Sequence, residues 1–130
     1  MRRIIFRGKS FVTGGMVYGD LIQWKDGARD ILVSDLDTGK KTKFRVSPET
    51  VGQFTGFYDK NGRRIFEGDI VKDHTKRPLE IREYEGSWVM WDRKSLIISY
   101  DHLNNYAEFI EIVGNIHGNP ELLKEGAQNG

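Results

Sequence analysis

The sequence predicts a mainly β protein, in which an N-terminal β-rich subdomain packs on a small C-terminal β-barrel that ends in a short helix. The apolar segments are short and rich in aromatic and β-branched residues, which pack well on pleated surfaces. Turn signals with glycine, aspartate or asparagine separate these segments, and the chain has 15 glycines. Short strands at such spacing favour a barrel or a sandwich over an alternating α/β fold.

Residues 1–54 form the expected N-terminal subdomain, a meander of short strands. Strands are predicted over residues 3–7, 16–24, 31–33 and 43–46. The second of these is either one strand or two strands that meet around Gly19. A turn is expected at the Asp-Gly step of residues 26–27. Ser47 and Pro48 predict a helical turn in which the serine is the N-cap.

Residues 57–66 predict a β-hairpin, the strongest local signal in the chain. Aromatic and β-branched residues flank the turn sequence Asp-Lys-Asn-Gly. Two geometries are open: a type I turn with Gly62 as a bulge residue, or a two-residue turn centred on Asn61 and Gly62. The type I turn is favoured because the side chain of Asp59 is placed to accept backbone hydrogen bonds at the start of the turn.

Residues 55–125 form the expected hairpin and barrel, and residues 126–130 form a disordered tail. A second corner is expected at Gly68. Further strands are predicted over residues 70–73, 79–84, 87–91, 96–100 and 109–113. The strand 79–84 alternates apolar and charged residues, so one of its faces is expected to be apolar. An Asn-Pro step then predicts a short helix over residues 121–125.

Composition places the chain among soluble globular proteins, with 38% hydrophobic and 30% charged residues. The chain has no cysteine, which removes disulfides, cysteine nucleophiles and thiolate metal sites and is compatible with the cytoplasm. The first apolar run is too short for the core of a signal peptide. No run reaches the roughly 20 residues that a membrane helix needs, so no membrane partner is expected.

The charge of the chain is unevenly distributed, although its net value is only +1. Residues 1–45 hold ten Lys and Arg against five Asp and Glu, whereas residues 79–130 hold four against nine. This asymmetry indicates a basic binding face, or halves that attract each other or a second copy. A solvated surface with scattered charges is the simpler interpretation.

Three segments share an order and spacing that is similar to a known family. They are Arg-Ile-Ile-Phe-Arg-Gly at residues 3–8 with Met-Val-Tyr-Gly at 16–19, the stretch 49–71, and the stretch 112–123. They resemble the YopX family of small phage and prophage proteins, and together they cover nearly the whole chain. The resemblance implies an SH3-like form for the barrel and a phage origin. It implies no catalytic residues or cofactor, because the function of the family is uncharacterised.

No catalytic or metal motif emerges from the sequence. His74, His102 and His117 are far apart, and none has the spacing of a helical metal pair. Asp73-His74 and Asp101-His102 would build a metal site only if their loops met. Polar loop residues are the favoured interpretation, because neighbours on a strand point to opposite faces. An enzyme would require a concave pocket that holds His74 or His102 with carboxylates nearby, and no cofactor or metal is predicted.

Basic clusters and tryptophans are the signals for a binding function. Trp88 and Trp91 lie three residues apart on one predicted strand, so one is expected in the core and the other on the surface. Phosphate contacts need cations on one face, and single-strand binders add aromatic platforms to them. The candidate nucleic-acid contacts are Lys41, Lys43, Arg63, Arg64 and Trp88. Basic residues on turns and edge strands also prevent aggregation.

The leading hypothesis is therefore a non-catalytic phage accessory protein in the cytoplasm of the host cell. It would act through contacts with a phage or host protein, or through self-association. The alternative hypothesis is a small β-barrel that binds nucleic acid through its basic clusters and an exposed aromatic residue.

Overall fold

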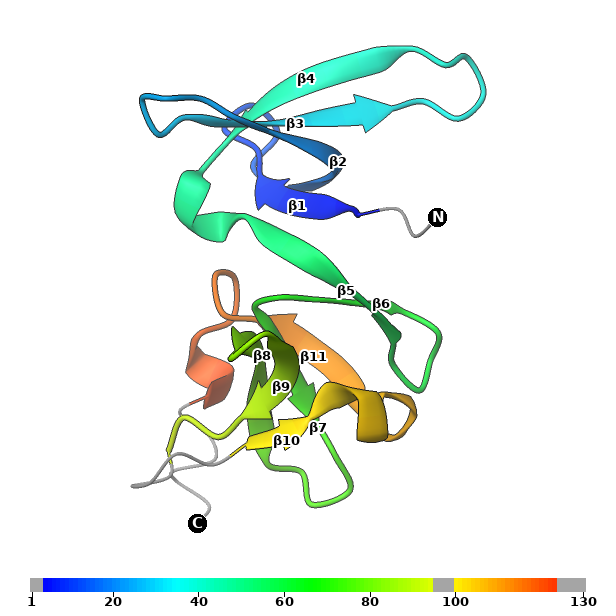
Figure 1. Ribbon diagram of the computed structural model, residues 1–130, viewed down its shortest axis with the longest axis vertical. Helices are drawn as coiled ribbons and strands as arrows, with labels where there is room; N and C mark the ends of the chain where they lie inside the picture. The colour runs from blue at the N-terminus through cyan, green and yellow to red at the C-terminus, as the bar shows by residue number, and fades with distance from the viewer. Residues whose placement is uncertain (1–3, 95–99, 124–130) are drawn as a thin grey trace. The chain divides into compact units, whose positions relative to one another are not determined.

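Antiparallel strands dominate the structure, a computed structural model that describes residues 4–94 and 100–123 (Figure 1). Helical backbone in this part of the chain is limited to short 3-10 turns and the residues 121–123. The prediction of a mainly β fold is therefore confirmed. None of the helices in the described ranges has the length and apolar character to cross a membrane. The chain divides into two units, Met1–Phe54 and Thr55–Gly130.

The first unit is an antiparallel meander. Its elements are β1 (Phe6–Lys9), β2 (Met16–Gln23), β3 (Arg29–Ser34), β4 (Lys41–Val46), the 3-10 turn η1 (Pro48–Thr50) and the start of β5 (Gly52–Tyr58). The strands lie in the order β4-β3-β2-β1-β5, and β3 and β4 form a long hairpin (cyan in Figure 1). The end of β4 returns to the start of the unit, where Val46 bridges to Ser10.

Strand β2 changes partners at Gly19. Residues 16–19 of β2 pair with β1, and residues 20–23 pair with β3. A Cβ atom at position 19 would lie 2.0 Å from the carbonyl oxygen of Leu32, so only glycine allows this approach of two backbones. The segment is thus one continuous strand rather than two.

Two local predictions for the first unit are corrected by the structure. The first strand begins at Phe6, because its pairing with β2 begins there, opposite Gly19. Ser47 precedes η1 but makes no side-chain hydrogen bond as a cap. The Thr50 hydroxyl instead donates to the Ser47 carbonyl oxygen at 2.6 Å and accepts the Lys9 N–H at 2.8 Å, which fixes the turn from the other end.

The second unit contains the rest of β5 and a five-stranded antiparallel sheet. Its elements are β6 (Arg64–Phe66), β7 (Asp69–Lys72), β8 (Pro78–Tyr84), β9 (Ser87–Trp91), β10 (Tyr100–His102), η2 (Leu103–Asn105), η3 (Ala107–Phe109) and β11 (Glu111–Asn115). The sheet order is β10-β9-β8-β7-β11, and its recorded pairings leave the sheet open. Its core consists of Ile65, Val71, Leu79, Ile81, Met90, Leu103, Ala107, Ile110 and Ile112.

The turn between β5 and β6 follows the type I prediction. The N–H of Gly62 donates to the carbonyl oxygen of Asp59 at 3.0 Å, and Gly62 has a φ of +78°. Asn61 does not have a positive φ, as a two-residue turn centred on Asn61 and Gly62 would require. The second corner also lies where it was predicted, at Gly68, with a φ of +92°.

The last strand was predicted too early. Residues 107–109 form η3, and β11 begins at Glu111. The chain is fixed at this point by Ile110, which is fully buried and whose carbonyl oxygen accepts the N–H of Lys60 at 2.9 Å. The strand predicted over 96–100 lies outside the described residues except for Tyr100. The end of the predicted helix and the tail also lie outside them.

Candidate functional site

The second unit has an open cavity of about 520 Å³. The residues that line it come from the β7–β8 loop, from β9 and β10, and from the two 3-10 turns. They are Asp73, His74, Met90, Asp101, Asn105, Tyr106, Phe109 and Ile110. One wall of the cavity is apolar, and part of its rim is acidic.

The apolar wall comes from the two consecutive 3-10 turns. Leu103 and Ala107 begin these turns and are buried in the core. Tyr106 follows the first turn and Phe109 ends the second. Both side chains are turned outward, with 44% and 65% of their surfaces exposed. Large apolar side chains that remain exposed beside a hollow are typical of binding surfaces.

The acidic rim is held in place by the loop after β7. The carboxylate of Asp73 accepts hydrogen bonds from the N–H and the hydroxyl of Thr75. Burial raises the pKa of Asp73, but these hydrogen bonds, together with the nearby His74 and Arg77, outweigh it and bring the pKa below its ordinary value. Asp73 is therefore ionised at neutral pH. Asp101 is a second carboxylate in the lining of the cavity.

The two Asp-His steps do not combine into one site. Asp73, His74 and Asp101 share the cavity, whereas His102 lines another hollow of about 450 Å³ with Phe57 and Trp88 among others. Across residues 4–94 and 100–123, no group of three or more His, Cys, Asp or Glu is placed to hold a metal ion. The cavity holds His74 with the carboxylates of Asp73 and Asp101, as the enzyme hypothesis requires, next to an apolar surface. Catalysis by these residues stays a hypothesis.

A cluster of aromatic side chains covers the outer face of β8, β9 and β10. The ring centroids of Tyr84, Trp91 and Tyr100 lie 5.1 to 6.0 Å apart, and the Arg82 guanidinium lies 4.5 Å from the centroid of Trp91. Trp88 packs instead against the core, from the same strand as Trp91. The two tryptophans thus lie on opposite faces of β9, as expected, but both are half-buried, so neither lies fully in the core or fully on the surface.

The five candidate nucleic-acid contacts lie in both units. Lys41 and Lys43 are exposed on β4 of the first unit, two residues apart and therefore on one face. Arg63 and Arg64 follow the hairpin turn of the second unit, where the Arg63 guanidinium donates to the carbonyl oxygen of Ile112 at 3.3 Å. Trp88 is half-buried and lines the smaller hollow. Their role in binding stays a prediction.

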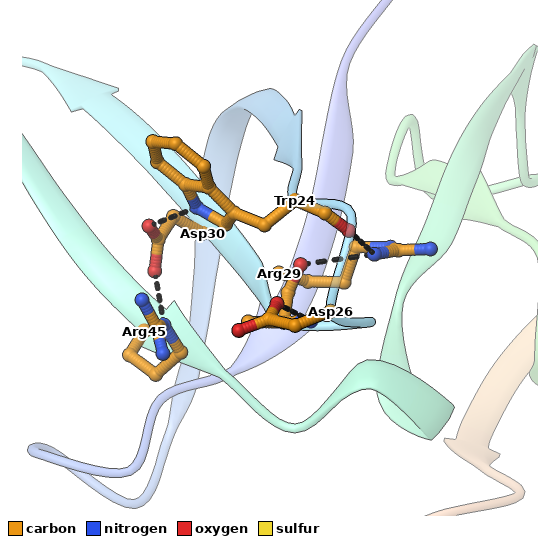
Figure 2. A network of polar contacts seen from close by, with 6 residues as sticks. Trp24, Asp26, Arg29, Asp30 and Arg45 are labelled. Carbon is orange, nitrogen blue, oxygen red and sulfur yellow. Dashed lines mark hydrogen bonds and ion pairs between the residues drawn. The ribbon is translucent and has the colours of Figure 1, made fainter.

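A buried carboxylate in the first unit was missed by the sequence analysis. Asp30 is only 2% exposed, and it accepts hydrogen bonds from Trp24 Nε1 at 2.7 Å and from Arg45 Nε at 2.6 Å (Figure 2). The hydrogen bond from Arg45 is the main cause that lowers the pKa of Asp30, against the effect of burial. The signal that identifies Asp30 is the β3–β4 register of the structure, which places it opposite Arg45.

Comparison with known proteins gives a family and a similar solved structure. A family model described as "YopX protein" matches residues 5–124. None of the curated proteins matches the sequence significantly. Among solved structures, the crystal structure of protein EF1440 from Enterococcus faecalis is similar, with a TM-score of 0.57 and 24% identity, over 95% of this chain and 99% of that chain. At this level of identity, the likeness shows the fold alone.

Proposed function

Because this chain belongs to the YopX family, we propose that it is a phage or prophage accessory protein that binds a segment of another protein without catalysing a reaction. The observation that carries the proposal is the cavity of the second unit, where the exposed Tyr106 and Phe109 stand beside the carboxylates Asp73 and Asp101. The partner is a phage or host protein in the cytoplasm of the host cell.

The strand arrangement supports a finer description of the second unit as SH3-like. Its sheet is a meander in which the last strand, β11, returns beside the first, β7, and 3-10 turns precede that last strand. SH3-like barrels share this arrangement, and SH3 domains bind extended peptides in aromatic-lined grooves. Fold analogy alone does not assign a function, so the proposal depends on the cavity itself.

The lining of the cavity defines the chemistry of the partner segment. The two exposed rings, Tyr106 and Phe109, offer contacts to an apolar side chain, and the buried Met90 and Ile110 lie beneath the cavity. The carboxylates of Asp73 and Asp101 favour a cation close to that side chain. The expected occupant is therefore an extended peptide segment in which an apolar residue stands near a Lys or Arg.

Fluorescence polarisation of labelled peptides tests this proposal. Three peptides share a Pro-Leu-Pro core that is flanked by Arg, by Ser or by Glu. We expect the Arg peptide to bind most tightly, with an affinity that falls as salt is added, and the Glu peptide not to bind. The Phe109→Ser variant should lose binding. The matched control Phe11→Ser, which changes a phenylalanine of the first unit with 66% exposure, should bind as the wild type does.

Two outcomes would contradict the proposal. One is equal binding of the Arg and Glu peptides, and the other is unchanged binding by Phe109→Ser. Sedimentation analysis separates self-association from binding of another protein. If no peptide binds and Phe109→Ser abolishes a dimer of the wild type, the occupant of the cavity is a second copy of this chain.

A further inference from the structure

Three cations form a row along β4 in the first unit. Lys41, Lys43 and Arg45 occupy alternate positions of this strand and are exposed. Alternate residues of a strand point to the same face and lie about 6.5–7 Å apart. Strand β4 is the end strand in the order of the first unit, so the row runs along the margin of its sheet.

The indole of Trp24 is held at the same face as this row. Its Nε1 donates to Asp30, the residue directly opposite Arg45 in the β3–β4 pairing. The ammonium of Lys43 lies 5.7 Å from the centroid of the Trp24 ring, which fits a cation–π contact. Figure 2 shows Trp24, which directly follows β2, and Arg45 of β4 reaching the carboxylate of Asp30.

Trp24 is well suited to receive a planar ligand. It is 45% exposed although it is one of the most hydrophobic side chains, and its hydrogen bond to a buried carboxylate fixes the direction of the ring. A ring that is already oriented loses little conformational freedom when a base stacks on it. Stacking of bases on aromatic side chains is the common platform of single-strand binders.

The exposed cations of this face lie on the end strand β4, whereas its carboxylates lie on β2, on β3 and in the turn between them. The carboxylate of Asp30 lies below the surface and is already bound by Arg45 and Trp24. Asp26 lies in the β2–β3 turn, where its carboxylate accepts the N–H of Ala28. Asp20 of β2 lies on this face as well, because it pairs with Leu32, which in turn pairs with Lys43. Three carboxylates thus match the three cations in number. Asp30 is buried and already bound by Arg45, whereas Lys41 and Lys43 are exposed on the end strand, where phosphate groups can contact them.

We propose that this face, defined by Trp24, Lys41, Lys43 and Arg45, binds single-stranded nucleic acid. One unstacked base lies on the indole, and the phosphates of the neighbouring nucleotides contact the row of cations. A duplex keeps its bases stacked on one another and so cannot use the indole in this way. Lysines that merely protect an edge strand from aggregation would show no such dependence on Trp24.

Fluorescence anisotropy of labelled oligonucleotides with the full chain tests this proposal. The probes are single-stranded DNA, single-stranded RNA and duplex DNA, each at low and at near-physiological salt. We expect both single strands to bind more tightly than the duplex, with an affinity that falls steeply with salt. The two single-stranded probes show which sugar the face prefers.

Three variants locate the binding. Trp24→Leu should weaken single-strand binding about ten-fold, whereas Trp24→Phe should restore part of it, because a phenyl ring still stacks. The double variant Lys41→Gln, Lys43→Gln should lower the slope of log affinity against log salt concentration by about two, because two phosphate contacts are lost. Arg82→Gln, which removes the cation from the aromatic cluster of the second unit, is the matched control and should leave binding unchanged.

The lysine variants keep the test valid even if a Trp24 variant does not fold, because both lysines are exposed. The proposal is wrong if no single strand binds at low salt, if the duplex binds as tightly as the single strands, or if the double variant binds as the wild type does. Loss of binding in Arg82→Gln would place the binding site in the second unit and would also overturn the proposal. Phe109→Ser should have no effect here, so this result is independent of peptide binding.

Discussion

The carboxylate of Asp59 accepts a hydrogen bond from the backbone N–H of Ile112, 53 residues further along the chain, at 3.1 Å. Its other oxygen accepts the N–H groups of Asn61 and Arg63, both at 2.9 Å, and so holds the hairpin turn. Asp59 is 4% exposed, which strengthens these charge-assisted bonds. One side chain thereby joins a local turn to the last strand of the second unit.

Replacing Asp59 with alanine should therefore lower the free energy of unfolding by more than the loss of the local turn hydrogen bonds alone. We expect Asp59→Ala to lower the free energy of unfolding by about 2–4 kcal/mol, because the N–H of Ile112 is left without its acceptor in the interior. Urea denaturation measures the change. The control is Asp35→Ala, which removes a carboxylate whose hydrogen bonds are local, from the N–H groups of Asp37 and Thr38 and from the side chain of Thr38. Equal losses in the two variants would show that the long-range bond contributes nothing.

Gly62 should resist substitution because of its backbone conformation and not because of space. Its φ is +78°, and nothing lies within 4 Å of the position of a Cβ atom. We expect Gly62→Val to lower the free energy of unfolding by about 1–2 kcal/mol or more, and Gly62→Asn to cost less, because asparagine tolerates this region. Thermal unfolding followed by circular dichroism ranks the two variants. A valine variant as stable as the wild type would contradict the turn geometry.

The stability of the first unit should depend on pH through Asp30. Its pKa is lower in the folded state than the ordinary value, so its contribution is present above the unfolded pKa and is lost as pH falls through the folded pKa. Urea unfolding of the wild type and of Asp30→Asn should show a difference in the free energy of unfolding that is constant above about pH 5 and narrows as pH falls below it. The lowered pKa values of Asp35 and Asp73 affect both proteins alike. A difference that stays constant with pH would contradict the prediction.

Arg93 should matter to stability although it is itself half exposed. It forms an ion pair with Glu80, whose side chain is only 8% exposed. Arg93→Ala leaves that carboxylate covered and without its cation, and we expect a loss of about 1–3 kcal/mol in the free energy of unfolding. The control is Lys60→Ala, which breaks a pair with Glu111 in which both side chains are well exposed, and which should change stability by less than about 0.5 kcal/mol. Equal effects would show that burial of Glu80 is unimportant.

Signals contained in a few neighbouring residues predicted the fold well. The turn at residues 59–62 could be assigned because Asp, Asn and Gly each favour one position of it. The alternation in β8 was also correct, since Leu79 and Ile81 lie in the core and Arg82 on the other face. The mainly β class follows because such local strand and turn signals recur along the chain.

Contacts between distant residues could not be predicted in the same way. The bond from Ile112 to Asp59 depends on the return of β11 beside β7. The outward position of Phe109 depends on the buried Leu103 and Ala107, so the apolar pattern alone placed it in a strand. Trp24 became a candidate only when the hairpin register placed Asp30 opposite Arg45.

Gly19 limits the substitutions that this chain can accept during evolution. The carbonyl oxygen of Leu32 occupies the place of any first side-chain carbon, so a descendant that keeps β2 shared between β1 and β3 must keep glycine there. The turn glycines Gly27 and Gly39 have positive φ and open surroundings, and asparagine can replace them at modest cost. Substitutions are thus tolerated at the turns of the first unit but not at the centre of its second strand.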